Sequence, residues 1–170
     1  MSNLKLGVEV HRAHGLMAKD GQGSASPFVE LQFDRQKFQT TVKEKDVNPY
    51  WNETFYFKIS DPNNMSNLTL DACVYNRNEG NDSQSFMGKV HINGTSFVAY
   101  SDASVFHYPL EKRSIFSHVK GELDLKVFIT DNPSVRSSDP FPQMDTPSSD
   151  AFFVVLYEYT QRGIKMICTL

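Results

Sequence analysis

Short runs of alternating apolar and polar residues recur along the first three quarters of the chain, with turn-forming residues between them. Leu4 to Val10, Thr54 to Ile59 and Leu68 to Tyr75 are the clearest runs. Alternate side chains of a strand point to opposite faces, so each run predicts a strand with one buried face. Further runs with strand character lie at 28–33, 87–92, 106–110 and 121–129, and a weaker, more polar run lies at 37–42.

About eight strands at this spacing predict an all-β fold, an antiparallel β-sandwich over residues 4–130. No segment keeps a helical period of 3.6 residues, which excludes a helical bundle. The side chains expected to be largely buried are Trp51, Phe55, Phe57, Leu70 and Val74.

The composition changes after Thr130. Residues 131–150 are rich in Pro, Ser and Asp and predict a mobile linker. Residues 151–170 are apolar again, but the run from Phe152 to Tyr157 is too short to cross a bilayer. We therefore expect a domain at 1–130, a linker at 131–150, and an apolar tail at 151–170 that packs loosely on the surface or remains disordered. Such a tail would promote self-association and could be a truncation product.

Charge and cysteine content exclude several classes of function. The formal net charge is −3, so no global basic field points to nucleic acid. The two cysteines, Cys73 and Cys168, form neither a disulfide framework nor a zinc-binding spacing. The first residues have no apolar signal core, which predicts a cytoplasmic location. The five histidines lie in no recognised catalytic or metal-binding motif, so we expect no enzyme activity and no cofactor.

Three stretches resemble the C2 domain, in the order and spacing of that family, over about residues 4–130. Residues 16–29 resemble its first loop, and residues 74–78 with 86–88 resemble its third loop and the strand that follows. The most specific match is Asn-Pro-Tyr-Trp-Asn-Glu-Thr-Phe-Tyr-Phe at residues 48–57. The single strand before the first loop and the long closing strand at 121–130 resemble the circularly permuted, type II form of the fold.

More narrowly, residues 19–24, 33–36 and 108–113 resemble an N-terminal C2 domain of plant multiple C2 domain and transmembrane region proteins, which include the FT-interacting and QUIRKY-type proteins. This resemblance implies a position at the endoplasmic reticulum, plasma membrane or plasmodesmata, peripheral to the membrane. It also implies a part in trafficking or in the intercellular transport of signalling proteins. Family members carry several C2 domains and a membrane region, so this chain could be a fragment of a longer protein.

The signature segment also has a physical interpretation. Asn48-Pro49 favours a turn, because proline fixes its own φ and restricts the residue before it. Trp51, the single tryptophan, is expected to anchor the core or the base of a loop. Asn52 and Glu53 are expected to satisfy loop backbone groups.

The resemblance implies five calcium-ligand positions, of which only Asp20 is a carboxylate; the other four are Ser26, Asn76, Asn78 and Ser85. Calcium affinity depends strongly on ligand charge, so we expect Asp20 to be a vestigial, weak metal ligand. The interpretation we favour for Asp20 is a loop residue that caps backbone N–H groups. Three nearby carboxylates could substitute in part: Asp46, Glu79 and Asp82.

Five basic residues are the candidate surface for a partner: Lys37, Lys43, Lys45, Lys112 and Arg113. We expect Lys43 and Lys45 to share one face of a strand. The function predicted is a non-enzymatic, calcium-independent docking module for a protein partner or an anionic phospholipid surface. A solvated strand face explains the lysines equally well, and calcium-dependent phospholipid binding is the alternative function.

Overall fold

The computed structural model describes residues 3–80, 83–132, 155–160 and 163–168. The chain divides into two compact units, Met1–Ser134 and Val135–Leu170. Among the described residues, no helix has the length and apolar character needed to span a membrane.

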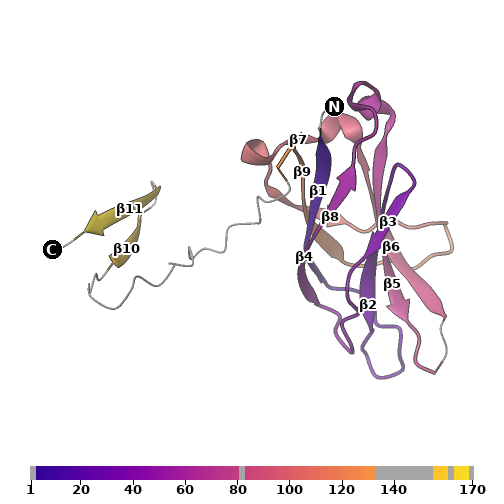
Figure 1. Ribbon diagram of the computed structural model, residues 1–170. Coiled ribbons are helices and arrows are strands. Elements are labelled where there is room, and N and C mark those ends of the chain that lie inside the picture. The colour runs from indigo at the N-terminus through magenta and orange to yellow at the C-terminus, as the bar shows by residue number, and fades with distance from the viewer. Residues whose placement is uncertain (1–2, 81–82, 133–154, 161–162, 169–170) are drawn as a thin grey trace. The chain divides into compact units, whose positions relative to one another are not determined.

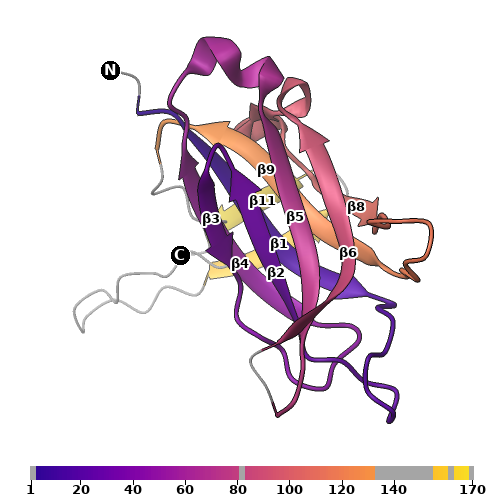
Figure 2. The same ribbon diagram turned by 90° about the vertical axis from the view of Figure 1, so that its right-hand side faces the viewer.

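The first unit is a sandwich of two sheets (Figures 1 and 2). One sheet, called sheet A, has the strand order β4–β1–β9–β7, and β8 also pairs with β9. The other, sheet B, has the order β3–β2–β5–β6. The strands are β1 (Lys5–His14), β2 (Pro27–Phe33), β3 (Gln36–Gln39), β4 (Tyr50–Lys58), β5 (Thr69–Arg77), β6 (Gln84–Asn93), β7 (Val98–Ala99), β8 (Val105–Pro109) and β9 (Glu122–Thr130), with short 3₁₀ helices η1 (Pro62–Asn67), η2 (Gly94–Ser96) and η3 (Tyr100–Asp102).

The prediction of an antiparallel β-sandwich is confirmed. The described part of this unit has one strand more than the eight expected, because the two-residue strand β7 pairs in parallel with β9. The closing strand β9 lies beside the first strand β1, as Lys5 pairs with Thr130 and His14 with Glu122. This order agrees with the expected closing strand, while the type II assignment stays a prediction.

The core lies between the sheets. Trp51, Phe57, Leu70 and Val74 are buried there, as predicted. Phe55 is only partly buried, because it packs against Phe38 on the short edge strand β3, where its ring stacks at a centroid distance of 5.7 Å.

Strand β1 is buried on both faces, whereas its alternation predicted one. Its outer face is covered by the buried ring of Phe128, which lies over Gly7 and contacts the rings of Tyr56 and Tyr100. Glu9, on the same face, is also buried. Since β1 pairs with β4 on one side and β9 on the other, this strand is the centre of sheet A.

The second unit contains an antiparallel hairpin of β10 (Val155–Thr160) and β11 (Gly163–Cys168), in which Val155 pairs with Cys168. Both strands fall in the segment expected to pack loosely on the surface or remain disordered; the two strands pair with each other, and the loose packing of the tail stays a prediction. The predicted linker falls almost wholly outside the described residues.

The contact between Gly7 and Phe128 can be tested with Gly7→Ala. A Cβ atom at position 7 would lie 2.3 Å from two ring carbons of Phe128, so the buried ring must move. We expect the free energy of unfolding to fall by about 1–3 kcal/mol, the usual cost of overpacking. Urea unfolding followed by Trp51 fluorescence measures this. Gly21→Ala is the control, because nothing lies within 4 Å of the added atom; equal midpoints for both variants would contradict the packing described.

Candidate functional site

Three loops meet at the lower end of the sandwich in Figure 1: loop 1 (residues 15–26), loop 2 (residues 40–49) and loop 3 (residues 78–83). Backbone hydrogen bonds tie them together. Loop 2 donates from Asp46 N to Ala25 O at 2.8 Å, and Leu16 N of loop 1 donates to Val47 O at 3.0 Å. Arg77 N, at the end of β5, donates to Ser26 O at 2.9 Å. The loops therefore form one connected surface.

The signature segment holds loop 2 in place. Trp51 Nε1 donates to Thr41 O at 2.8 Å, and the Glu53 carboxylate accepts from Thr41 N at 3.0 Å and from Thr41 Oγ1 at 2.6 Å. Asn48 Oδ1 accepts from Gly15 N at 2.8 Å, which joins loop 2 to loop 1. Asn52 has φ +52°, a left-handed conformation that asparagine tolerates better than most residues. The roles expected of Trp51 and Glu53 are those the structure shows.

The third-loop positions form a network of neutral side chains. Asn76 Oδ1 accepts from Ser26 N at 2.7 Å, and Asn76 Nδ2 donates to Asn78 Oδ1 at 2.8 Å. Asn78 Oδ1 also accepts from Ser85 Oγ at 3.1 Å, while Asn78 Nδ2 donates to Ser83 Oγ at 2.7 Å. Four of the five calcium-ligand positions implied by the resemblance thus lie together. The amide oxygens of Asn76 and Asn78 already accept hydrogen bonds from the protein itself.

Asp20 is engaged within loop 1. Its Oδ1 accepts from Gln22 N at 3.1 Å and from Ser24 N at 2.5 Å, and its Oδ2 accepts from Ser24 Oγ. The hydrogen bonds from Ser24 lower the pKa of Asp20 below its ordinary value. These contacts are those of a carboxylate that caps loop backbone groups.

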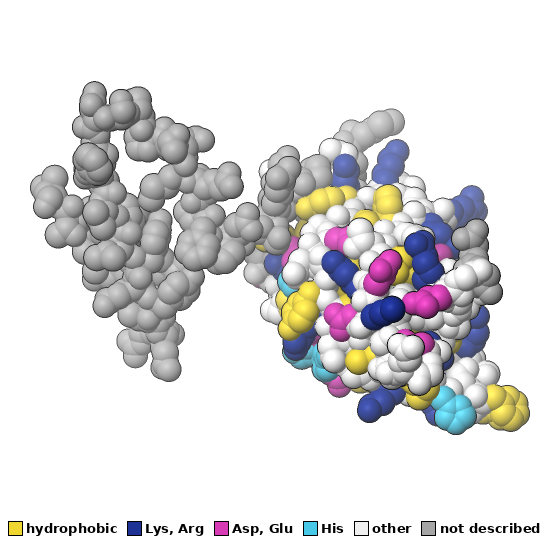
Figure 3. Space-filling model, turned by 90° about the horizontal axis from the view of Figure 1, so that it is seen from below, with side chains coloured by type: hydrophobic (Ala, Val, Ile, Leu, Met, Phe, Trp, Pro, Cys, Tyr) yellow, Lys and Arg dark blue, Asp and Glu magenta, His cyan; other side chains and the backbone are white. Residues whose placement is uncertain are grey.

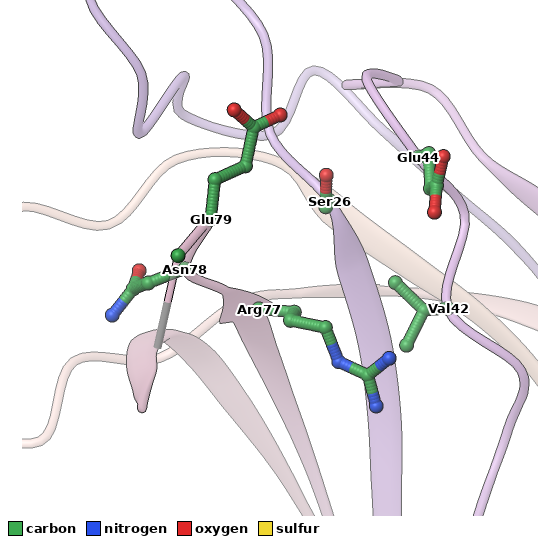
Figure 4. A pocket seen from close by; sticks show the side chains of 7 residues that line it. Ser26, Val42, Glu44, Arg77, Asn78 and Glu79 are labelled. Atoms are coloured by element: carbon green, nitrogen blue, oxygen red, sulfur yellow. The ribbon is translucent and has the colours of Figure 1, made fainter. Parts of the chain in front are cut away.

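An open pocket of about 500 Å³ lies between loops 2 and 3 (Figure 4). Arg77 extends across it towards Val42, and the carboxylates of Glu44 and Glu79 lie above Arg77 in this view. A smaller cavity of about 170 Å³, lined by Asp20 and Asn76, shares Arg77 and Glu79. Sequence reasoning gave neither Arg77 nor Glu44 a role, although Arg77 lies within the third-loop match at residues 74–78. Arg77 places a positive charge where a calcium ion would need compensating negative charge.

The proposed substitute carboxylates are also engaged. Asp46 Oδ1 accepts from Asn48 N at 2.7 Å, and Glu79 lies 3.9 Å from Lys45 Nζ. Asp82 lies outside the described residues.

The structure separates the lysines that the sequence placed on one strand. Lys37 lies on β3 and forms an ion pair with Glu30 at 3.0 Å. The strand ends at Gln39, so Lys43 and Lys45 lie in loop 2, and Lys45 has φ +55° within a turn. The prediction that these two lysines share a strand face is therefore wrong. Figure 3 shows acidic and basic side chains interspersed over the loop end of the domain.

Lys112 and Arg113 lie in loop 4 (residues 110–121), between β8 and β9. Its base is next to the start of loop 1, since a Cβ atom at Gly121 would lie 3.0 Å from Gly15 O. Arg113 lies over the ring of Phe86 on β6, 4.5 Å from its centroid, and donates to Tyr75 Oη at 3.2 Å.

Ile115 and Phe116 are the most exposed large apolar residues in the described part of the chain, at 86% and 84%. Lys112 and Arg113 precede them and Lys120 follows, all three exposed. Sequence reasoning missed this pair, although an apolar pair between basic residues in a loop was a usable signal.

Comparison with known proteins agrees with this geometry. Residues 4–110 match the C2 domain family model. The chain is 56% identical to Multiple C2 domain and transmembrane region protein 7 of Arabidopsis thaliana over 138 residues, which is 81% of this chain and 14% of that protein. It is 44% identical to Protein QUIRKY of the same plant over 73% of this chain and 12% of that protein. The chain thus spans about a seventh of the length of these relatives.

Among solved structures, a C2 domain of plant Extended Synaptotagmin 1 has a TM-score of 0.64 and 28% identity, over 76% of this chain and 95% of that one. A tandem pair of C2 domains from Extended-Synaptotagmin 2 shares the fold, with a TM-score of 0.61 at 20% identity over 76% of this chain and 42% of that one. With its two-sheet sandwich, its signature segment and a family match over most of the domain, the chain belongs to the C2 domain family.

Proposed function

We propose that this C2 domain docks, without calcium and without catalysing a reaction, to an anionic phospholipid surface. The observation that carries the proposal is the exposed pair Ile115–Phe116 between Lys112, Arg113 and Lys120. Transfer of each apolar side chain out of water is worth about 1.5–3 kcal/mol, and each basic residue near an anionic bilayer about 1 kcal/mol. These contributions suffice for reversible recruitment to a membrane surface.

Calcium independence is supported by the loop network. A calcium ion takes roughly 6–8 oxygen ligands, and its affinity rises with their charge. Here Asn76 and Asn78 offer neutral oxygens that already accept hydrogen bonds, and Arg77 adds a positive charge. Asp20 is the single carboxylate among the five positions, and it already accepts hydrogen bonds from Ser24 and Gln22. Calcium-dependent phospholipid binding is the competing function.

The relatives support a membrane setting, since their names record a transmembrane region and several C2 domains. We propose that this domain works at the cytoplasmic surface of a membrane, in trafficking or intercellular signalling. The endoplasmic reticulum, plasma membrane and plasmodesmata are the proposed locations. A protein partner at the same basic surface is the outcome that remains if lipid binding fails.

Vesicle co-sedimentation tests the docking surface. The full chain should sediment, in the presence of a calcium chelator, with vesicles that contain phosphatidylserine but not with phosphatidylcholine alone. Ile115→Ser with Phe116→Ser should weaken this binding about tenfold or more, because the buried apolar area is lost. Phe106→Ser is the control, since Phe106 is also exposed but lies on β8 rather than at the loop tip. Undiminished binding by the double variant would contradict the role of loop 4.

Calorimetry tests calcium independence. The unmodified chain should bind no calcium at micromolar concentrations, whereas Ser26→Asp, Asn76→Asp, Asn78→Asp and Ser85→Asp together should create a site, because they restore the missing charge. Without calcium the new carboxylates repel one another, so the melting temperature should fall in chelator and rise on addition of calcium. Asp20→Asn in this variant should weaken the new site. Tight calcium binding by the unmodified chain would overturn the proposal.

A further inference from the structure

Three adjacent strands of sheet A bring two imidazoles and two carboxylates together on its outer face. The β1–β9 register pairs His14 with Glu122 and Arg12 with Asp124, and the β8–β9 register pairs His107 with Asp124. Directly paired residues project from the same face of a sheet. Residues from positions 14, 107 and 122–124 therefore become neighbours, although they are far apart in sequence.

The side-chain atoms converge on one point. His107 Nδ1 lies 2.6 Å from Asp124 Oδ1, and His14 Nε2 lies 3.6 Å from the same oxygen and 3.2 Å from Glu122 Oε2. One ligand atom from each of His14, His107 and Asp124 lies within 4.8 Å of the other two. Around a tetrahedral zinc ion with bonds near 2.0–2.2 Å, neighbouring ligand atoms are about 3.3 Å apart. The distances given above between ligand atoms, 2.6 Å, 3.2 Å and 3.6 Å, lie on both sides of 3.3 Å.

His14 Nε2 supplies a second, independent observation. This atom is buried and has no hydrogen-bond partner, although two carboxylates lie nearby. A buried nitrogen that makes no hydrogen bond is unfavourable and rare in folded proteins, and the neighbours of this one are carboxylate oxygens of Glu122 and Asp124, at 3.2 Å and 3.6 Å. A cation bound between the imidazoles and Asp124 would accept the lone pair of this nitrogen.

Asp124 is positioned as a ligand by its neighbours. Its side chain is only 4% exposed. Arg12 Nε donates to Oδ2 at 2.9 Å, which leaves Oδ1 turned towards the two imidazoles.

We propose that His14, His107 and Asp124, with Glu122 at the rim, form a binding site for a zinc-like transition-metal ion. Two imidazole nitrogens and carboxylate oxygens suit zinc, whereas calcium and magnesium prefer ligands that are all oxygen. To bind, His107 gives up its hydrogen bond to Asp124 and presents a neutral nitrogen. Asp124 and Glu122 balance the charge of a divalent ion.

Arg12 sets the strength of this site. Its guanidinium positions Asp124 in the manner of an outer-shell partner of a metal ligand. Its positive charge opposes the metal, although its Nη1 also donates to Tyr50 Oη at 2.7 Å and so lies partly towards that ring. The site should therefore bind zinc reversibly and more weakly than a structural zinc centre, so that a strong chelator removes the ion.

Calorimetric titration of the full chain, without a histidine tag, with Zn²⁺ tests this site. We expect a single ion per chain, a rise in melting temperature, and reversal of both by EDTA. His14→Gln with His107→Gln should abolish the binding. His91→Gln is the matched control. His91 also forms an ion pair with a carboxylate, that of Asp71 at 2.5 Å, but this ion pair includes no second histidine. The control variant should therefore bind zinc like the unmodified chain.

Co²⁺ gives a second readout on the unmodified chain, since a tetrahedral nitrogen and oxygen site produces visible absorption that Zn²⁺ displaces. This measurement needs no variant, so it holds even if the double variant does not fold. The proposal is overturned if the unmodified chain binds neither ion. It is equally overturned if the double variant keeps the binding, or if His91→Gln removes it.

Discussion

The position of the loop end depends on the hydrogen bonds that Thr41 forms with the signature segment: its carbonyl accepts from Trp51 Nε1, and its N–H and hydroxyl donate to the Glu53 carboxylate. They fix the start of loop 2 against β4, and loop 2 in turn bonds to loop 1 through Asp46 N and Ala25 O. Because the indole is buried, its N–H needs a partner inside the protein, and Thr41 O is that partner. Val42 and Glu44, which line the pocket, follow Thr41 in loop 2, so the shape of the pocket depends on this anchor.

The asparagine network shows how a metal-binding geometry can be kept without its charge. An asparagine has nearly the shape of an aspartate but offers an N–H donor as well as an oxygen, so Asn76 and Asn78 bond to each other. Paired aspartates at these positions would repel one another in the absence of an ion. The loops of this chain are therefore organised by their own hydrogen bonds, and Arg77 occupies the space between them.

The sandwich could be predicted from the sequence because alternation records which strand face is buried, and the signature segment located the loops. Other features depend on residues remote in sequence. The outer face of β1 is buried by Phe128, which no local pattern near Gly7 reveals. Lys43 and Lys45 lie beyond the strand because β3 ends at Gln39, and the backbone turns at Lys45 with a positive φ. Likewise, His14, His107 and Asp124 become neighbours only through the pairing of three strands, so neither spacing nor motif could identify them.

The position of β9 has a consequence for how the domain forms during synthesis. Lys5 pairs with Thr130, so the two central strands of sheet A come from opposite ends of the domain's sequence. On the ribosome, β1 and β4 can pair early, but the other edge of β1 stays open until Thr130 emerges. An open edge strand can pair with other chains, and closing so long a loop slows folding. The nascent chain thus depends on its last strand to cover the edge left exposed by its first.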